Sequence, residues 1–305
     1  MRPLRGILLK LGSVMTFVVM ASLVKYLSDD FPPGQIVFFR SVFALPVILV
    51  WLVLRHELRT GFRARKPLGH LWRGLLGTSA MGMGFASLGY LPLPEVTAIG
   101  YAAPLLVVVF AAMFLGEKVR LFRMTAVGVG MIGVLIVLSP RLSVGEDLST
   151  AQALGAMLAL TGAVMAALAQ VTVRKLVASE TTSAIVFWFS ITAAGVSLIT
   201  LPWGWVLPTL WQASVLILTG LLGGVGQILL TSSYREADAS LIAPFDYASI
   251  LLALAIGYWG FGDAPSPTML LGALIVVAAG ILIIWRERQL GLERTRQRKV
   301  MTPQG

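Results

Sequence analysis

An apolar stretch long enough to cross a membrane occurs twice in this sequence, each time with a tyrosine at a matching place. The first copy spans residues 96–115, contains Tyr101 and is followed by Glu117. The second contains Tyr247 and is followed by Asp263, and the two tyrosines are separated by the same spacing as the two acidic residues. This shared spacing predicts a fold built from two copies of one helical unit.

The composition requires that most of the surface faces lipid. Of the residues, 57% are hydrophobic and 12% are charged, whereas a soluble domain carries about 25% charged residues. Apolar windows of roughly 17–25 residues recur along the chain, and this is the length that an α-helix needs to cross a bilayer. The sequence therefore predicts an all-α membrane protein with several spans.

Ten membrane-spanning helices are predicted, with both termini in the cytoplasm. If the N-terminus is cytoplasmic, all but Lys25, Arg40 and Arg141 of the 24 Lys and Arg residues fall on that side, as the positive-inside rule requires. The net charge of +10 follows from this bias and indicates no nucleic-acid partner. The predicted spans are Ile7–Leu27, Gln35–Leu54, Leu71–Tyr90, Val96–Leu115, Met124–Leu138, Leu154–Val173, Ala184–Leu201, Trp211–Tyr234, Ser240–Phe261 and Met269–Trp285.

Further segments match between the two halves. Residues 36–41 resemble residues 185–190, and Gly74-Leu75-Leu76-Gly77 repeats as Gly220-Leu221-Leu222-Gly223. These pairs follow one another in the same order in both halves, which supports a duplication of the whole unit.

The duplication divides the chain into residues 1–142 and 150–290, and residues 291–305 are predicted to form a basic, disordered cytoplasmic tail attracted to anionic lipid. Each half holds five spans, an odd number, so the second copy must enter the membrane from the opposite side. Such inverted repeats are typical of secondary transporters, whose binding site lies near the midplane between the halves and which work by alternating access.

These features together resemble the drug/metabolite transporter superfamily, in its EamA-domain branch. The resemblance covers nearly the whole chain and depends on the ten spans, on Arg40 in a phenylalanine-rich second span, on Gly116-Glu117-Lys118 and on residues 260–265. It implies a small-molecule transporter of the bacterial inner (plasma) membrane, with a cavity lined mainly by the first, third, fourth, sixth, eighth and ninth spans. It also implies that Glu117 is a structural residue at a helix end, and Asp263 stands where the family usually has Glu.

Asp246 is the leading candidate for chemistry inside the membrane. It lies about six residues, or roughly 9 Å, beyond the cytoplasmic start of the predicted ninth span, where a carboxylate usually faces the bundle interior. Helical spacing aligns it with the small residues Ser249, Ala253 and Gly257. It is predicted to couple transport to protons or to bind a substrate ammonium group; the alternative is a structural carboxylate bonded to a neighbouring helix.

Gln170 and Gln227 lie at a similar depth in the sixth and eighth spans, whereas their counterparts in the first half, such as Met81, are apolar. Together they predict an asymmetric substrate-binding pocket, polar on one side and lined by methionine on the other, which suits an amphipathic or aromatic ligand. The alternative is that methionine fills gaps in a packed core.

Tyr101 and Tyr247 each lie near a proline, Pro104 or Pro244, where a span is expected to loosen. Proline removes a backbone hydrogen bond and leaves a carbonyl free to face the cavity. The two tyrosines are therefore predicted to orient a polar substrate, although either can instead be structural.

Arg40 is expected to extend its side chain outward, to Asp29, Asp30, Glu95 or a lipid phosphate. The alternative is a cation that binds a carboxylate.

An enzyme is not predicted. The sequence has no Gly-x-x-x-x-Gly-Lys-Ser/Thr motif for ATP and no cysteine, and His56 and His70 fall in one basic loop, so neither a metal site nor a cofactor is expected.

The favoured function is export of an amino acid or related small metabolite. The alternative is uptake of a larger aromatic or cofactor-like metabolite, such as a vitamin or nucleoside derivative, and a channel or structural protein is less favoured. Assembly as a homodimer stays open.

Overall fold

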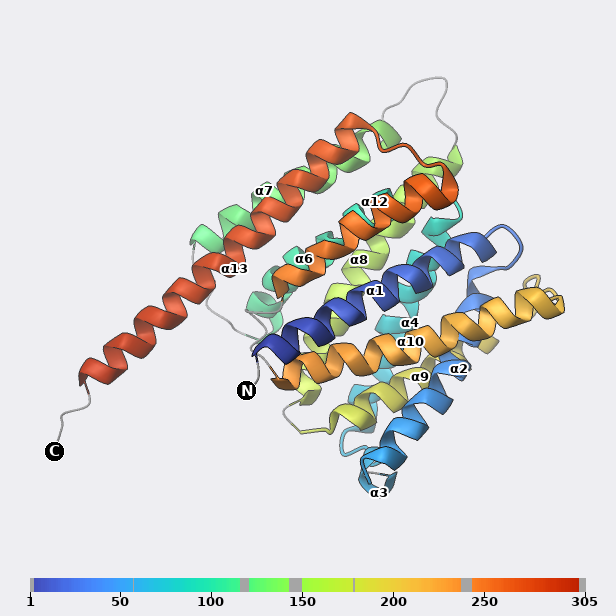
Figure 1. Ribbon diagram of the computed structural model, residues 1–305, viewed down its shortest axis with the longest axis horizontal. Helices are drawn as coiled ribbons and strands as arrows, with labels where there is room; N and C mark the ends of the chain where they lie inside the picture. The colour runs from blue at the N-terminus through green and yellow to red at the C-terminus, as the bar shows by residue number, and fades with distance from the viewer. Residues whose placement is uncertain are drawn as a thin grey trace.

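The computed structural model describes residues 3–56, 58–115, 121–142, 150–177, 179–236 and 243–301. In these residues the chain is helical and contains no strand. The helices, shown in Figure 1, are α1 (Pro3–Leu27), α2 (Pro33–Leu54), α3 (Leu58–Gly61), α4 (Pro67–Leu88), α5 (Leu93–Gly100), α6 (Ala102–Leu115), α7 (Leu121–Leu142), α8 (Thr150–Val177), α9 (Thr182–Leu198), α10 (Leu210–Glu236), η1 (Ala243–Tyr247), α12 (Ala248–Phe261) and α13 (Pro267–Met301).

Each of the ten predicted spans corresponds to helix in the described chain, although two spans are divided between two elements and α3 lies in a predicted loop. Five helical stretches of the described chain are long and apolar enough to cross a membrane, and four shorter apolar helices accompany them. Proline lies in the first turn of α2, α4 and α5, because its missing N–H costs nothing there. The all-helical, membrane-type fold is therefore confirmed.

The fourth and ninth spans are not continuous helices. The fourth breaks at Tyr101, between α5 and α6. The described part of the ninth starts with the 3₁₀ turn η1, which becomes α12 after Tyr247. Pro104 cannot donate to the carbonyl of Gly100, so the α-helical ladder is interrupted one turn before the proline. The predicted loosening at both tyrosines is thus confirmed.

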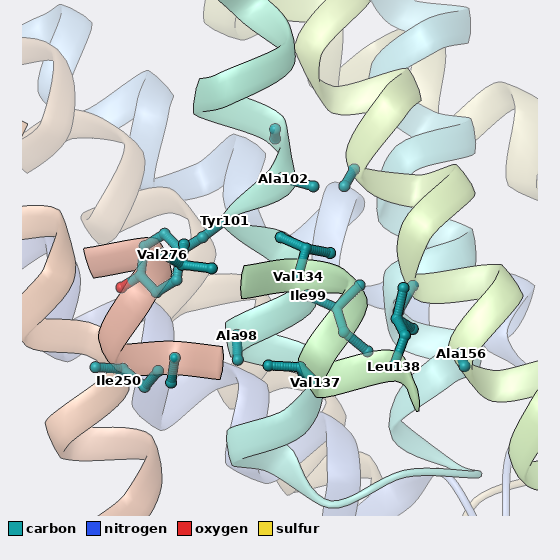
Figure 2. Packing of buried hydrophobic residues seen from close by; sticks show 14 of the residues in the cluster. Ala98, Ile99, Tyr101, Ala102, Val134, Val137, Leu138, Ala156, Ile250 and Val276 are labelled. Carbon is teal, nitrogen blue, oxygen red and sulfur yellow. The ribbon is translucent and has the colours of Figure 1, made fainter. Parts of the chain in front are cut away.

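Helices from the two halves of the chain pack against each other throughout the bundle. α1 packs on α10, α4 on α8, α7 on α13 and α2 on α9, and several of these pairs lie side by side in Figure 1. The largest apolar core lies among α5, α6, α7, α8, α12 and α13. Figure 2 shows Ile99, Val137, Leu138 and Ile250 in this core.

Glycine allows the backbones of α7 and α13 to approach closely. A Cβ added at Gly133 would lie 2.9 Å from the carbonyl oxygen of Gly272, and one added at Gly272 would lie 2.6 Å from that of Gly133. Gly128, also on α7, is exposed and has nothing within 4 Å of an added Cβ. Gly133 is therefore a packing residue, and Gly128 is not.

The sequence analysis placed His70 in a loop, and this prediction was wrong. His70 lies in α4, is buried, and its Nε2 is 3.5 Å from Oε2 of Glu180. The other carboxylate oxygen, Oε1, accepts hydrogen bonds from the backbone N–H groups of Arg65 and Lys66 at 2.8 and 2.6 Å. Glu180 thus connects the start of α4 with the turn before α9.

The segment after the last span is helical as far as Met301, where a disordered tail was predicted. Arg, Glu, Gln and Leu are favourable helix formers, and extending an existing helix requires no new nucleus. The end of α13 projects beyond the other helices in Figure 1.

Replacing Gly133 by Ala is expected to destabilise the bundle by about 1–3 kcal/mol, because the added methyl meets backbone and not a flexible side chain. Thermal unfolding of the purified protein in detergent measures the loss. The matched control is Gly128→Ala, which should keep or slightly raise the melting temperature, since Ala is a better helix former than Gly. Equal melting temperatures for the two variants would contradict the close packing of α7 on α13.

Candidate substrate-binding site

Asp246 pairs with a lysine of the first helix. Its Oδ1 lies 2.7 Å from Nζ of Lys10. The side chain of Lys10 is only 2% exposed, whereas that of Asp246 is 44% exposed. The carboxylate therefore faces an accessible space and compensates a cation that has been withdrawn from solvent.

Lys10 is the residue that the sequence analysis missed. It was counted among the positive charges of the cytoplasmic side, but the structure buries it. The signal was present, because Lys10 lies three residues inside the first predicted span, and a charge within a span usually has a partner in the bundle.

Tyr101 connects the two broken spans. Its hydroxyl donates to the backbone carbonyl of Asp246 at 2.7 Å and also forms a hydrogen bond with Oγ of Ser249. The rings of Tyr101 and Tyr247 also meet, with centroids 4.9 Å apart. Tyr101, at the break in the first half, thus provides a hydrogen-bond donor for a backbone carbonyl at the break in the second half.

Tyr247 extends to α13. A Cβ added at Gly280 would overlap the hydroxyl of Tyr247, so only glycine leaves room for the phenol at this position. Tyr247 and Tyr101 both belong to the large apolar core. The tyrosine pair is thus packed by α5, α6 and α13 and positioned beside Asp246.

Gln170, Gln227 and Met81, the other predicted site residues, form no hydrogen bond with Asp246 or the two tyrosines in the described part of the chain. Gln170 is exposed although it lies on the same face of α8 as the buried Ala163 and Ala167. Gln227 on α10 is half-buried. In the described part of the chain neither amide forms a hydrogen bond. Met81 packs against the second apolar cluster, formed mainly by α1, α2, α4 and α10.

A second ion pair lies at the opposite end of α1. Nζ of Lys25 is 4.0 Å from Oδ2 of Asp263, and it donates to the carbonyl of Leu91 at 3.1 Å. Gly262, with φ 71°, ends α12 in the left-handed conformation. Asp263 thus connects the end of α12 to Lys25 on α1. Its counterpart Glu117 lies outside the described residues.

Arg40 does not extend outward, so this expectation was wrong. It is buried, and in the described part of the chain it pairs with none of Asp29, Asp30 or Glu95. Asp30 instead accepts a hydrogen bond from Nε2 of Gln212 at 3.0 Å. The packing of α2 against α10 directs the guanidinium inward, to Gly223.

Comparisons with known proteins define the class. The EamA-like transporter family matches residues 4–139 and 153–285. The chain is 29% identical to the pseudopaline exporter of Pseudomonas aeruginosa over 91% of this chain and 95% of that protein. It is 28% identical to the S-adenosylmethionine uptake transporter of Rickettsia bellii, with 87% and 88% covered. It is also 27% identical to the riboflavin transporter of Vibrio cholerae, with 96% and 97% covered.

A solved crystal structure shares the fold. It is 19% identical, covers 93% of this chain and 98% of its own, and superposes with a TM-score of 0.67. The two matched segments and the names of the relatives indicate a membrane transporter. The chain belongs to the EamA-like transporter family and is a multi-pass protein of the bacterial inner membrane.

A double-mutant cycle tests the Lys10–Asp246 pair. Asp246→Asn is expected to lower the free energy of unfolding by about 2 kcal/mol, because it removes the carboxylate 2.7 Å from the buried ammonium of Lys10. Lys10→Met should cost less, because solvent reaches Asp246. The double variant should be more stable than the sum of the two losses predicts. Strictly additive losses in thermal unfolding would show that the two side chains do not interact.

Proposed function

We propose that this protein is a secondary transporter that moves a small organic metabolite across the inner membrane by alternating access. The observation that carries the proposal is the meeting of two interrupted spans at Tyr101, Tyr247 and Asp246. Broken helices at the interface of two repeats form the binding sites of many transporters, because unwound backbone can be tolerated only where it is buried or lines a cavity.

The architecture that we propose is an inverted repeat of two five-helix units, residues 1–142 and 150–290, with both termini cytoplasmic. Two findings support it. The family matches the chain in two separate segments. In addition, α1, the first span of the first unit, packs on α10, the third span of the second unit, and α8, the first span of the second unit, packs in the same way on α4, the third span of the first unit. Rocking of one unit against the other would open the seam alternately to the two sides.

The two ion pairs of α1 are suited to gate this movement. Lys10–Asp246 and Lys25–Asp263 connect opposite ends of α1 to opposite ends of η1 and α12. Both pairs are formed in this structure, and opening at either side requires that one of them separates. Asp246 is the proposed coupling residue, because a change in its charge would weaken its attraction to Lys10.

The cargo that we propose contacts Asp246, the two tyrosines, Gln170 and Gln227, with Met81 on the apolar side. The relatives are named for pseudopaline, S-adenosylmethionine and riboflavin, and include an exporter and an uptake transporter. These names favour the larger, cofactor-like class of metabolite that the sequence analysis kept as its alternative. Export of an amino acid or related compound stays a prediction.

Counterflow in proteoliposomes tests the proposal. Vesicles that contain the purified protein and a high internal concentration of one metabolite should accumulate trace external label of that metabolite, and the rate should saturate. The panel comprises amino acids, S-adenosylmethionine and riboflavin. Protein-free vesicles are the control. Flux that is linear in concentration and insensitive to internal substrate would indicate a channel and contradict a transporter.

Asp246→Asn is expected to abolish the pH dependence of this transport, because the variant cannot exchange a proton at position 246. The comparison is the counterflow rate at acidic and at neutral pH for protein that still unfolds cooperatively. Asp29→Asn, at an exposed position, is the matched control and should keep the normal profile. An unchanged pH profile in Asp246→Asn would remove this residue from coupling.

A further inference from the structure

Two arginines lie inside the bundle without an acidic partner among the described residues. Arg40 of α2 is 4% exposed, and Arg73 lies on the face of α4 that carries the buried Gly74 and Gly77. Nε of Arg40, and Nε and Nη1 of Arg73, are buried without a hydrogen bond. Among the residues that the structure describes, neither guanidinium forms a salt bridge.

Both guanidinium groups converge on one aromatic ring. Cζ of Arg73 lies 4.2 Å from the ring centroid of Phe189 on α9, and Cζ of Arg40 lies 5.6 Å from it. The ring attracts each cation through its quadrupole, but it carries no net charge. Phe189 therefore positions the two groups near each other and leaves their charge uncompensated.

Glycines of the duplicated motif make room for the pair. A Cβ added at Gly223 would lie 2.9 Å from Nε of Arg40, and one added at Gly77 would overlap Nη1 of Arg73. Phe189 occupies the place in the second half that Arg40 occupies in the first, according to the matched segments. Backbone and one aromatic ring from four helices, α2, α4, α9 and α10, thus surround the two cations.

Two like charges in a low-dielectric interior are unfavourable unless an anion joins them. The guanidinium fork presents parallel N–H donors that match the oxygens of a carboxylate or phosphate. Arg73 is only half-buried, so part of its side chain is accessible from outside the bundle. We infer that Arg40 and Arg73 form a binding site for an oxyanion group, carboxylate or phosphate, of the transported metabolite. This inference rests on the proposed transport function and adds the chemical class of the cargo.

The test is the melting temperature of the full-length protein in lipid nanodiscs. The probes are sodium propionate, methyl phosphate, the uncharged propionamide and additional sodium chloride, at matched ionic strength. Propionate or methyl phosphate should raise the melting temperature by roughly 3 °C or more at saturation, and whichever does so identifies the oxyanion. Propionamide and chloride should have no such effect.

The variants Arg40→Met and Arg73→Met should each abolish the shift. Methionine keeps much of the side-chain volume and removes an uncompensated charge, so folding should persist. Arg55→Met is the matched control and should keep the shift, because Arg55 is exposed at the end of α2, over the ring of Trp51 at 5.2 Å. If a methionine variant fails to fold, the lysine variant at the same position should fold and show a weaker shift, because lysine lacks the fork.

Three results would overturn the inference: no shift with either oxyanion, a shift that survives both methionine variants, or an equal shift with chloride, which would show an adventitious ion only. The readout does not depend on transport. Oxyanion binding without counterflow would contradict the proposed function and, with it, the assignment of this site to a cargo. Counterflow without oxyanion binding would contradict this site alone.

Discussion

The hydrogen bond from Tyr101 to the carbonyl of Asp246 is the interaction on which the centre of the bundle depends. Inside a membrane no water replaces a lost partner, so every unwound backbone group must be satisfied by protein. A buried carbonyl without a partner would cost about 1–3 kcal/mol. By joining one interrupted span to the other, Tyr101 allows both to stay broken, and the resulting junction lies beside an ion pair with an accessible carboxylate.

Four cations inside the bundle fall into two groups with different consequences. Lys10 and Lys25 have carboxylate partners, Asp246 and Asp263, and these pairs connect α1 to η1 and α12. Arg40 and Arg73 share an aromatic ring, and in the described part of the chain neither has a carboxylate partner. A compensated pair can act as a contact between moving parts, because it can separate and re-form. An uncompensated pair attracts an anion from outside the protein, which is useful in a molecule that must bind its cargo and release it.

Much of the fold could be predicted from the sequence. The spans, their matching order and the loosening near Pro104 and Pro244 follow from hydrophobicity and from the missing N–H of proline, which are local properties. The predictions for Lys10, Arg40 and His70 failed for one shared reason. Each was assigned by its distance along the chain from a membrane surface, whereas its environment is set by a helix or turn distant in sequence.

The sequence by itself determined that this chain enters the membrane many times, that it was built from two similar units and that a charged residue, Asp246, lies within a span. Only the tertiary structure decided which groups meet: that Asp246 faces Lys10, that Tyr101 reaches across to the other half, and that Arg40 and Arg73 converge on Phe189. The physical reason is that a segment enters lipid because of the hydrophobicity of its own side chains, which the sequence shows directly. Compensation of a buried charge instead depends on a partner that packing brings from another helix.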